Sequence, residues 1–401
     1  MTTTGALADL SLRRARTAVV VAFAMAGLAL ASFLARTPSV REELGLSTAQ
    51  LGLLLLCVSV SSVASLPASG PIVARLGPAR SVAVGAVSVG LGQALVGVGL
   101  ATATIAFAGL GLAFIGLGTG VWDVAMNVEG ADVERRLGRS LMPKLHAAFS
   151  IGTVAGGGVG AATAAADVPL AVQMFAIAVI TPMVVLLATK RFLGRETVPD
   201  VAPGASRFGI LDAWREPRTL LVGLMVLGFA FTEGSANDWI ALAFVDGYRA
   251  NEAIGAVAFG SFMAAMTVGR FFGGRLLDRF GRVVMLRATA AVALVGLLLV
   301  LFGGSVPLAL LGALLWGLGA SLGFPVGMSA AADDPARAAA RVSAVSSIGY
   351  TAFLAGPPLI GLLGQHVGIL AALLVVLAAL ALGLLTSGAA RPLPETGPKP
   401  S

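Results

Sequence analysis

The sequence contains a single cysteine, Cys57, and only two histidines, His146 and His366, in 401 residues. One cysteine excludes an intramolecular disulfide and any metal site built from a cysteine cluster. These three residues also supply neither a nucleophile–base set nor metal ligands, so we expect no enzyme activity and no cofactor. No P-loop motif occurs, so we expect any transport to be driven by an ion gradient rather than by nucleotide hydrolysis.

Charge is scarce as well. Charged residues make up 12% of the chain and apolar residues 57%, and the mean hydropathy is +0.93. A soluble domain usually carries about 25% charged residues. The sequence has too little polar surface to cover a water-soluble particle, which predicts a membrane protein.

Uncharged segments recur at the length that crosses a bilayer, roughly 20 helical residues. The runs 81–122 and 288–332 are each long enough for two helices, and a further span is interrupted by Glu233 and Asp238. We therefore expect an all-α membrane protein with twelve transmembrane helices. They are placed near residues 17–35, 46–69, 81–100, 105–128, 144–164, 168–189, 219–242, 253–273, 284–303, 306–331, 342–363 and 367–388.

The basic residues are distributed unevenly among the expected loops. With the N-terminus in the cytoplasm, 24 of the 27 Lys and Arg residues fall on the inner side, and only Arg36, Arg41 and Arg249 fall outside. Cytoplasmic loops are enriched in Lys and Arg, so both termini are expected in the cytoplasm. The isoelectric point near 10.6 then reflects this bias and anionic lipid headgroups rather than nucleic-acid binding.

The two halves of the chain resemble each other. Residues 190–218 form a polar, proline-bearing segment, which predicts a cytoplasmic linker between six-helix bundles at 1–189 and 219–390, followed by a tail at 391–401. Three short segments recur at offsets of 204, 201 and 197: 70–77 with 274–281, 116–118 with 317–319, and 150–152 with 347–349. Repeats in matching order predict two pseudo-symmetric bundles.

One of these segments carries a specific motif. Its residues are Gly274, Leu276, Asp278, Arg279, Gly281, Arg282 and Leu286. In this order and spacing they resemble the signature loop of the major facilitator superfamily, and the twelve expected spans extend the resemblance over the whole chain. The chain is loosely similar to fucose-permease-like bacterial members. The resemblance implies two bundles around a central cavity that opens alternately to either side, with substrate near the bilayer midplane.

The signature loop is expected to act as a gate. Asp278 can accept hydrogen bonds from the positive N-terminal end of a helix in the other half, which the resemblance places near Pro143 and Lys144. The first-half copy has Ala74 at the aspartate position, so we expect a latch that depends mainly on Asp278. The alternative is that the loop only sets topology through its positive charge. The gating candidates are Gly274, Asp278, Arg279, Gly281, Arg282, Gly70, Arg75 and Gly77.

Two acid–amide pairs lie within expected spans. Asp123 and Asn127 are four residues apart, as are Glu233 and Asn237, and such neighbours share one helix face. Charged groups inside a membrane are costly and tend to be functional or paired, so we expect these residues to bind substrate or protons. Three tryptophans on cavity helices implied by the resemblance are candidates for stacking against substrate: Trp122, Trp239 and Trp316.

Two further charged residues are expected to have other roles. Glu129 is expected to be solvated at the cytoplasmic interface. Arg270 is expected at the inner end of its helix, where it would snorkel to the membrane surface or anchor the gate loop.

The function expected from these features is secondary active transport of a small solute by a monomer. Paired acid–amide sites favour proton coupling, although sodium coupling and either direction of transport stay open, and a sugar or sugar acid is the expected substrate. The alternative is a proton-antiport efflux pump for amphipathic compounds, because the glycines between 152 and 161 resemble an antiporter motif with Gly157 in place of its proline. A receptor or an intramembrane enzyme is disfavoured by the short tail and the missing catalytic residues.

Overall fold

The computed structural model describes residues 3–46, 48–193 and 209–393. Every regular element in these ranges is a helix. The first half contains α1 (Thr3–Leu34), α2 (Thr37–Glu43), α3 (Thr48–Leu76), α4 (Pro78–Ala101), α5 (Ile105–Leu137), α6 (Met142–Ala165) and α7 (Leu170–Thr189). The rest contains α8 (Ile210–Ala213), α9 (Pro217–Leu242), the π-helix η1 (Ala243–Gly247), α10 (Glu252–Phe280), α11 (Arg282–Phe302), α12 (Val306–Ala320), α13 (Gly323–Ala331), α14 (Ala338–Val367), α15 (Ile369–Ala372), α16 (Val375–Thr386) and the 3-10 helix η2 (Ser387–Ala390).

Eleven helical segments of the described residues are long and apolar enough to cross a membrane. They correspond to eleven of the twelve expected spans, and three of them run across neighbouring elements, from α9 to η1, from α12 to α13 and from α15 to η2. The remaining expected span, 253–273, falls on α10, a 29-residue helix that is not among the eleven. The count of twelve therefore stays a prediction.

Matching turns join α3 to α4 and α10 to α11. Gly77 and Gly281 each precede the next helix with φ of 78° and ψ of 162° and 161°, respectively. Residues with a side chain rarely adopt this φ. The signature loop and its divergent first-half copy therefore share one backbone conformation, although their charged residues differ.

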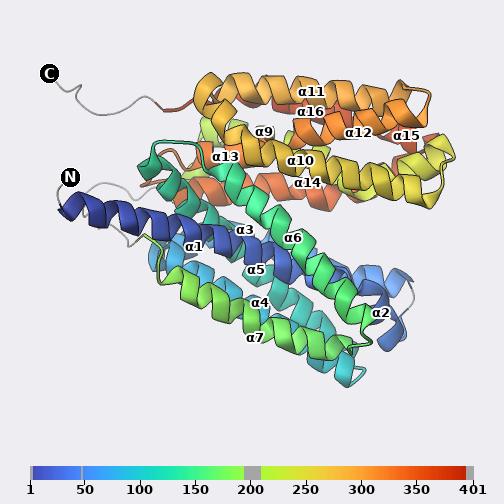
Figure 1. Ribbon diagram of the computed structural model, residues 1–401, viewed down its shortest axis with the longest axis horizontal. Helices are drawn as coiled ribbons and strands as arrows, with labels where there is room; N and C mark the ends of the chain where they lie inside the picture. Colours follow the sequence, from blue (N-terminus) through green and yellow to red (C-terminus); the bar gives the residue numbers. More distant parts are fainter. Residues whose placement is uncertain (1–2, 47, 194–208, 394–401) are drawn as a thin grey trace.

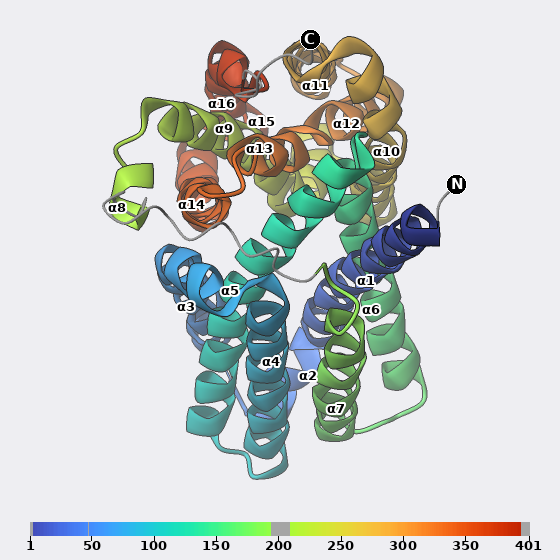
Figure 2. The same ribbon diagram turned by 90° about the vertical axis from the view of Figure 1, so that its left-hand side faces the viewer.

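The helices form two groups that correspond to the halves of the chain (Figure 1). Helices α1–α7 lie in the lower group and α9–α16 in the upper one, with both groups approaching each other at the end where α1 begins and η2 ends. We call this the termini end. Toward the opposite end, which holds α2 and α15, the groups diverge. The end-on view in Figure 2 places α3 beside α14 and α6 beside α10 at the junction of the groups, and both helix pairs are in contact.

The hydrophobic cores follow the same division. One buried cluster contains residues of both halves, including Phe23, Leu145, Phe229 and Phe324. A second cluster around Trp316 belongs to the second half alone, and a third, which includes Phe33, belongs to the first half. The halves therefore share apolar packing in one region and pack independently elsewhere.

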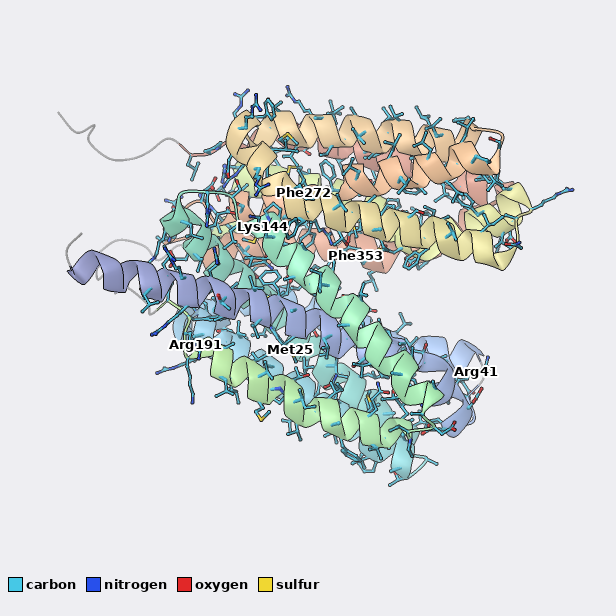
Figure 3. All side chains as sticks on the ribbon, viewed as in Figure 1. Met25, Arg41, Lys144, Arg191, Phe272 and Phe353 are labelled. Carbon is cyan, nitrogen blue, oxygen red and sulfur yellow. The ribbon has the colours of Figure 1, made fainter. Side chains whose placement is uncertain are left out.

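Charged side chains mark the two ends. Figure 3 shows Arg41 at the diverging end, whereas Lys144 and Arg191 lie toward the termini end. Arg41 is one of three basic residues expected outside the cell, and Lys144 and Arg191 are among the 24 expected inside. Arg41 is thus separated along the molecule from Lys144 and Arg191, and the side of the membrane on which each end lies stays a prediction.

Candidate functional site

Asp123 and Asn127 form a buried pair on α5. The Asn127 amide donates to the Asp123 backbone carbonyl at 2.9 Å and to its Oδ1 at 3.3 Å. Asp123 is 5% exposed and Asn127 is fully buried. The neighbour relation expected from their spacing is therefore present.

The same aspartate reaches the second half of the chain. The Ser346 hydroxyl lies 3.5 Å from Asp123 Oδ2, and the Tyr350 hydroxyl also hydrogen-bonds the carboxyl group. Both partners are on α14, one turn apart. Asp123 thus joins α5 to a helix of the other half, and a change in its charge would act on a contact between the halves.

His146 extends this pair to α6. Its Nε2 lies 3.3 Å from Asn127 Oδ1, and its ring is held edge-on between Phe23 and Phe324 with centroid distances of 5.2 and 5.4 Å. Phe23 comes from the first half and Phe324 from the second. The imidazole is 8% exposed, so it is part of the interface between the halves.

Glu233 forms an ion pair with Arg270. Glu233 Oε2 and Arg270 Nη2 are 2.8 Å apart, and their side chains are 13% and 5% exposed. The guanidinium also donates from Nη1 to the Ser150 hydroxyl at 3.0 Å and from Nε to the Ser321 carbonyl at 3.3 Å. Arg270 therefore connects α9 and α10 with α6 of the other half.

The expected role of Arg270 as an anchor of the gate loop is corrected by this geometry. Helix α10 continues ten residues beyond Arg270 to Phe280, which is about 15 Å of helix. Arg270 is therefore not at the helix end. A basic residue inside an expected span was the available signal for a buried role, because such charges need a partner.

Asn237 does not repeat the arrangement seen around Asp123. Glu233 takes an arginine partner, and within the described residues the buried Oδ1 of Asn237 has no hydrogen-bond donor. The acid–amide spacing thus occurs twice in the sequence, but it produces a hydrogen-bonded pair only on α5.

The groups around Asp123 and Arg270 make up one polar network. We define it as Asp123, Asn127, His146, Ser150, Glu233, Arg270, Ser346 and Tyr350. Ser150 lies one turn after His146 and donates to its carbonyl at 3.1 Å, and Tyr350 lies within electrostatic range of Glu233. Four members come from each half, so the network crosses the interface.

The three tryptophans lie elsewhere. Trp122 is 2% exposed and Trp316 fully buried, both inside hydrophobic clusters, and Trp239 packs against the second cluster. Trp122 is adjacent in sequence to Asp123, and successive helical side chains point about 100° apart, so it faces Gly85 of α4 instead. A role of the tryptophans in substrate binding stays a prediction.

Glu129 is buried rather than solvated. It is 2% exposed, and its Oε1 accepts a hydrogen bond of 2.6 Å from the backbone amide of Leu193. The expectation of a solvated interfacial charge was wrong because the segment after α7 covers this part of α5. That contact joins residues 64 positions apart, beyond what local spacing can show.

At the termini end, carboxylates bind the start of α6. Asp278 Oδ1 accepts from the Ser140 amide at 2.7 Å, close to the position expected for this contact. Glu134 Oε2 accepts from the amides of Leu141 and Met142 at 2.6 and 2.7 Å. These amides have no partners within the helix, and the helix dipole favours negative charge there. The first turn of α6 is therefore held from both halves.

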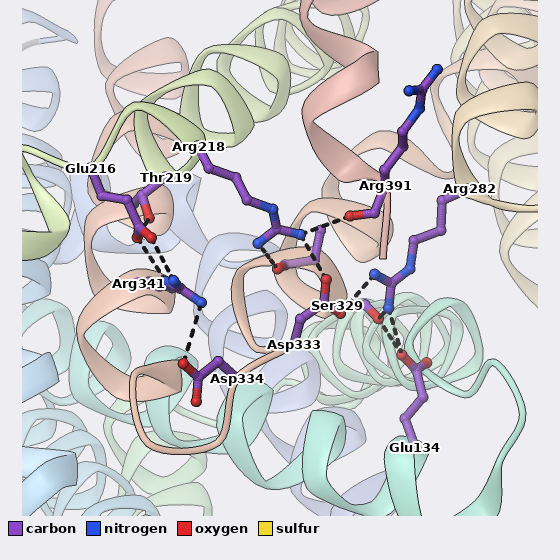
Figure 4. Close-up of polar contacts among 11 residues, drawn as sticks. Glu134, Glu216, Arg218, Thr219, Arg282, Ser329, Asp333, Asp334, Arg341 and Arg391 are labelled. Carbon is purple, nitrogen blue, oxygen red and sulfur yellow. Dashed lines mark hydrogen bonds and ion pairs between the residues drawn. The ribbon is translucent and has the colours of Figure 1, made fainter. Parts of the chain in front are cut away.

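Glu134 was not among the site candidates, although it follows Asp123 and Asn127 on the same stripe of α5. Its other oxygen contacts the Ser329 hydroxyl and lies 4.0 Å from Arg282. Arg282 in turn donates to Asp333 Oδ1 at 2.7 Å, as Figure 4 shows. Together with Asp278 and Ser140, these residues form what we call the gate cluster.

The gate cluster lines a pocket of about 280 Å³ between α5, α10 and α13. Gly274 is close to it, because a Cβ there would lie 2.9 Å from the Ser140 carbonyl. Arg279 instead lies over the Phe280 ring at 5.1 Å. Of the expected gate residues, Asp278 and Arg282 are therefore the ones in polar contact with this region.

The first-half loop packs closely against α14. Gly70 approaches α14 so closely that a Cβ would lie 3.0 Å from Ser343 Cβ, and the Ser343 hydroxyl donates to the Leu66 carbonyl at 2.6 Å. On the other side of the interface, Asp278 and Glu134 bind backbone amides at the start of α6. A latch that depends mainly on Asp278 stays a prediction.

A second ionic group lies beside the gate cluster in Figure 4. Arg218 binds Asp333 Oδ2 at 2.7 Å, and Glu216 binds Arg341 through Nε at 2.7 Å. Burial alone would raise the pKa of Glu216, but hydrogen bonds from Arg341 and Thr219 and the charges of Arg341 and Arg337 lower it. Glu216 is therefore held as a carboxylate, which fixes the start of α9 to the start of α14.

Comparison with known proteins identifies similar chains. A family model described as Major Facilitator Superfamily matches residues 17–351 and, in a second match, 239–401. An uncharacterized MFS-type transporter of Yersinia pestis is 31% identical over 375 residues, 92% of this chain and 93% of that relative.

Solved structures agree in fold. The transporter FucP, the fucose:proton symporter of E. coli, has a TM-score of 0.79 in its outward conformation at 16% identity, with 95% of this chain and 99% of that one covered. The proton:xylose symporter XylE has a TM-score of 0.71 at 13% identity, with 94% and 95% covered. At these identities the likeness shows the fold alone.

Proposed function

The chain belongs to the Major Facilitator Superfamily, and we propose that it is a proton-coupled secondary transporter that moves a small solute by alternating access. The observation that carries this proposal is the polar network, which contains two carboxyl groups and crosses between the halves. Asp123 contacts α14 of the other half directly, whereas Glu233 pairs within its own half with Arg270, which contacts α6 across the interface. Protonation of Asp123 would change a contact between the halves, and protonation of Glu233 would release the arginine that makes the other one.

We further propose the membrane arrangement that the basic residues predict. Both termini and the linker at 190–218 lie in the cytoplasm of a bacterium, and twelve helices, α10 included, cross its inner membrane as a monomer surrounded by lipid. The bundles are 1–189 and 219–390, with a tail at 391–401. In this orientation the gate cluster closes the cytoplasmic side, and the diverging end faces outward.

A sugar or sugar acid is the substrate that this site supports best. The network offers hydroxyl, amide and charged groups, namely those of Ser150, Ser346, Tyr350, Asn127 and Arg270. Such groups hydrogen-bond a polyhydroxylated solute and give little binding to an apolar one. The sugar symporters of the same fold add no evidence on the substrate of this chain, because their identity to it is low.

Efflux of amphipathic compounds receives no separate support from the glycines of α6. A Cβ at Gly152, Gly156 or Gly160 would lie 1.9, 2.4 or 2.7 Å from atoms of α1 or of the segment that follows it. Close helix packing therefore explains their spacing. Gly157 and Gly158 have open space on their side of the helix.

This packing explanation predicts opposite outcomes for two neighbouring glycines. Gly152→Ala is expected to reduce folded yield sharply, because its Cβ would meet the carbonyl oxygen of Ala24 and backbone cannot move aside. Overpacking of this kind costs about 1–3 kcal/mol or more. Gly157→Ala is the matched control and should fold and transport normally. Monodisperse yield in size-exclusion chromatography measures both, and loss of transport in well-folded Gly157→Ala would instead favour a motif function.

The proposed function is tested by uptake into proteoliposomes. The purified full chain is screened by thermal shift at pH 6 and pH 8 with neutral sugars and sugar acids, and compounds that stabilise it are used as radiolabelled substrates. We expect accumulation when an inward proton gradient is imposed and its loss when a protonophore is added. Uptake that ignores the gradient would contradict proton coupling, and gradient-driven expulsion of a cationic dye instead would favour the efflux pump.

A further inference from the structure

Arg270 is a cation kept inside the membrane-spanning region. The residue is 4% exposed, and no solvent-facing position explains its charge. Placing an arginine at the centre of a membrane helix costs about 2.5–3.5 kcal/mol on insertion scales. A charged residue at such a position tends to have a function that depends on its charge.

The guanidinium divides its two terminal nitrogens between the halves of the protein. Nη2 binds Glu233 Oε2 at 2.8 Å, within its own half, and Nη1 donates to the Ser150 hydroxyl at 3.0 Å, across the interface. The two nitrogens of an arginine fork match the two oxygens of one carboxylate, and such bidentate pairs are stronger than a bond to a neutral hydroxyl. A free carboxylate is therefore a better partner for the whole fork than Glu233 and Ser150 together.

Resting on the proposed transport function, we infer that the solute carries a carboxylate group that replaces Glu233 and Ser150 on Arg270. The substrate class is then a sugar acid or a similar hydroxylated carboxylate rather than a neutral sugar. Ser150 contacts the guanidinium directly, and Ser346 and Tyr350 belong to the same polar network, so their hydroxyl groups are the ones we expect to hydrogen-bond the rest of such a molecule.

The exchange balances charge. Arg270 and Glu233 form a neutral pair before binding. When the anion takes Arg270, Glu233 is left as an unpaired buried carboxylate, which is strongly unfavourable unless it takes up a proton. One anion and one proton therefore enter this site together, and they leave it together when Glu233 returns to Arg270.

The exchange also loosens the interface. The bond from Arg270 to Ser150 links α10 to α6, and an anion on the fork removes it. The ionisable groups that face this pair from other helices are His146 on α6, Tyr350 on α14 and, through Tyr350, Asp123 on α5. Substrate binding would thus change the two contacts through which the polar network joins the halves.

The inference is tested by binding to the purified full chain. D-Glucuronate and D-galacturonate are each compared with the matched neutral sugar, D-glucose or D-galactose, by calorimetry at pH 6 and pH 8. We expect each neutral sugar to bind at least about tenfold more weakly than its acid, since one charge-assisted bond is lost. We also expect the acids to bind more tightly at pH 6, because binding brings a proton to Glu233.

Three variants test whether acid binding depends on Arg270 and its pH dependence on Glu233. Glu233→Gln copies the protonated state, so it should bind the acids equally at both pH values. The double variant Arg270→Gln/Glu233→Gln removes both charges, leaves neither unpaired and should lose acid binding by about tenfold or more. Arg249→Gln removes an exposed arginine and should bind as the wild type does.

The outcomes separate this inference from the proposed function. Equal binding of acid and neutral sugar, unchanged acid binding by the folded double variant, or no binding of either acid would overturn the carboxylate site. Gradient-driven uptake of a neutral sugar would then leave transport intact. Acid binding that depends on Arg270 without any gradient-driven uptake would support the site and contradict the proposed transport.

Discussion

An Asp123→Asn variant is expected to lose accumulation of solute against its gradient while still exchanging solute across the membrane. The amide keeps the size of the side chain and can still accept hydrogen bonds from Ser346 and Tyr350. It cannot take up or release a proton. Glu233→Gln is expected to behave in the same way, because the amide no longer requires a proton when Arg270 changes partner.

The measurement is a pair of assays on the same proteoliposomes. Uptake under an imposed proton gradient should fall to the level seen without a gradient, whereas counterflow, which needs no proton, should persist. Asp246→Asn is the matched control, since Asp246 is exposed at the end of η1 and should leave both assays unchanged. If Asp123→Asn and Glu233→Gln both accumulate solute as the wild type does, proton coupling through these residues is refuted.

The second large effect is expected at the gate cluster. The double variant Glu134→Gln/Asp278→Asn should open the termini end, because three backbone amides of the segment 140–142 lose their ionic acceptors. Hydrogen bonds to charged groups contribute about 1.5–3 kcal/mol each. Loss of one such bond therefore shifts the ratio of closed to open molecules by roughly tenfold or more.

A cysteine at the gate reports this opening. Cys57 is the chain's single cysteine, so the Cys57→Ser variant has no thiol that a maleimide could label. Ala332→Cys is introduced into this variant as the position to be alkylated. Ala332 is 2% exposed and lines the gate pocket. Alkylation there should be slow in the parent and about tenfold faster or more in the double variant. The control is Asp167→Asn, an exposed residue after α6.

The single variant Asp278→Asn distinguishes the two explanations of the signature loop. A latch that depends on the carboxylate predicts faster alkylation and impaired transport. If Asp278→Asn shows the parental alkylation rate and normal transport, the loop would act only by setting topology through its positive charge.

Much of the fold follows from local patterns along the chain. Uncharged runs of membrane length predicted eleven of the spans that the helices now show. The repeat of 70–77 at 274–281 predicted two similar halves, and within it Gly77 and Gly281 have the same backbone conformation. These features depend on residues close in sequence, where helical periodicity and glycine geometry act directly.

The sequence by itself determined the class of protein, the stripe on α5 that pairs Asp123 with Asn127, and the gate contact of Asp278. Only the tertiary structure decided that Arg270 pairs with Glu233, that Glu129 is covered after α7, and that Asp123 binds α14. Those partners are 37, 64 and 223 positions away. Helix periodicity states which side of a helix a residue occupies, but the packing of distant helices decides which residue faces it, and with it the free energy of a buried charge.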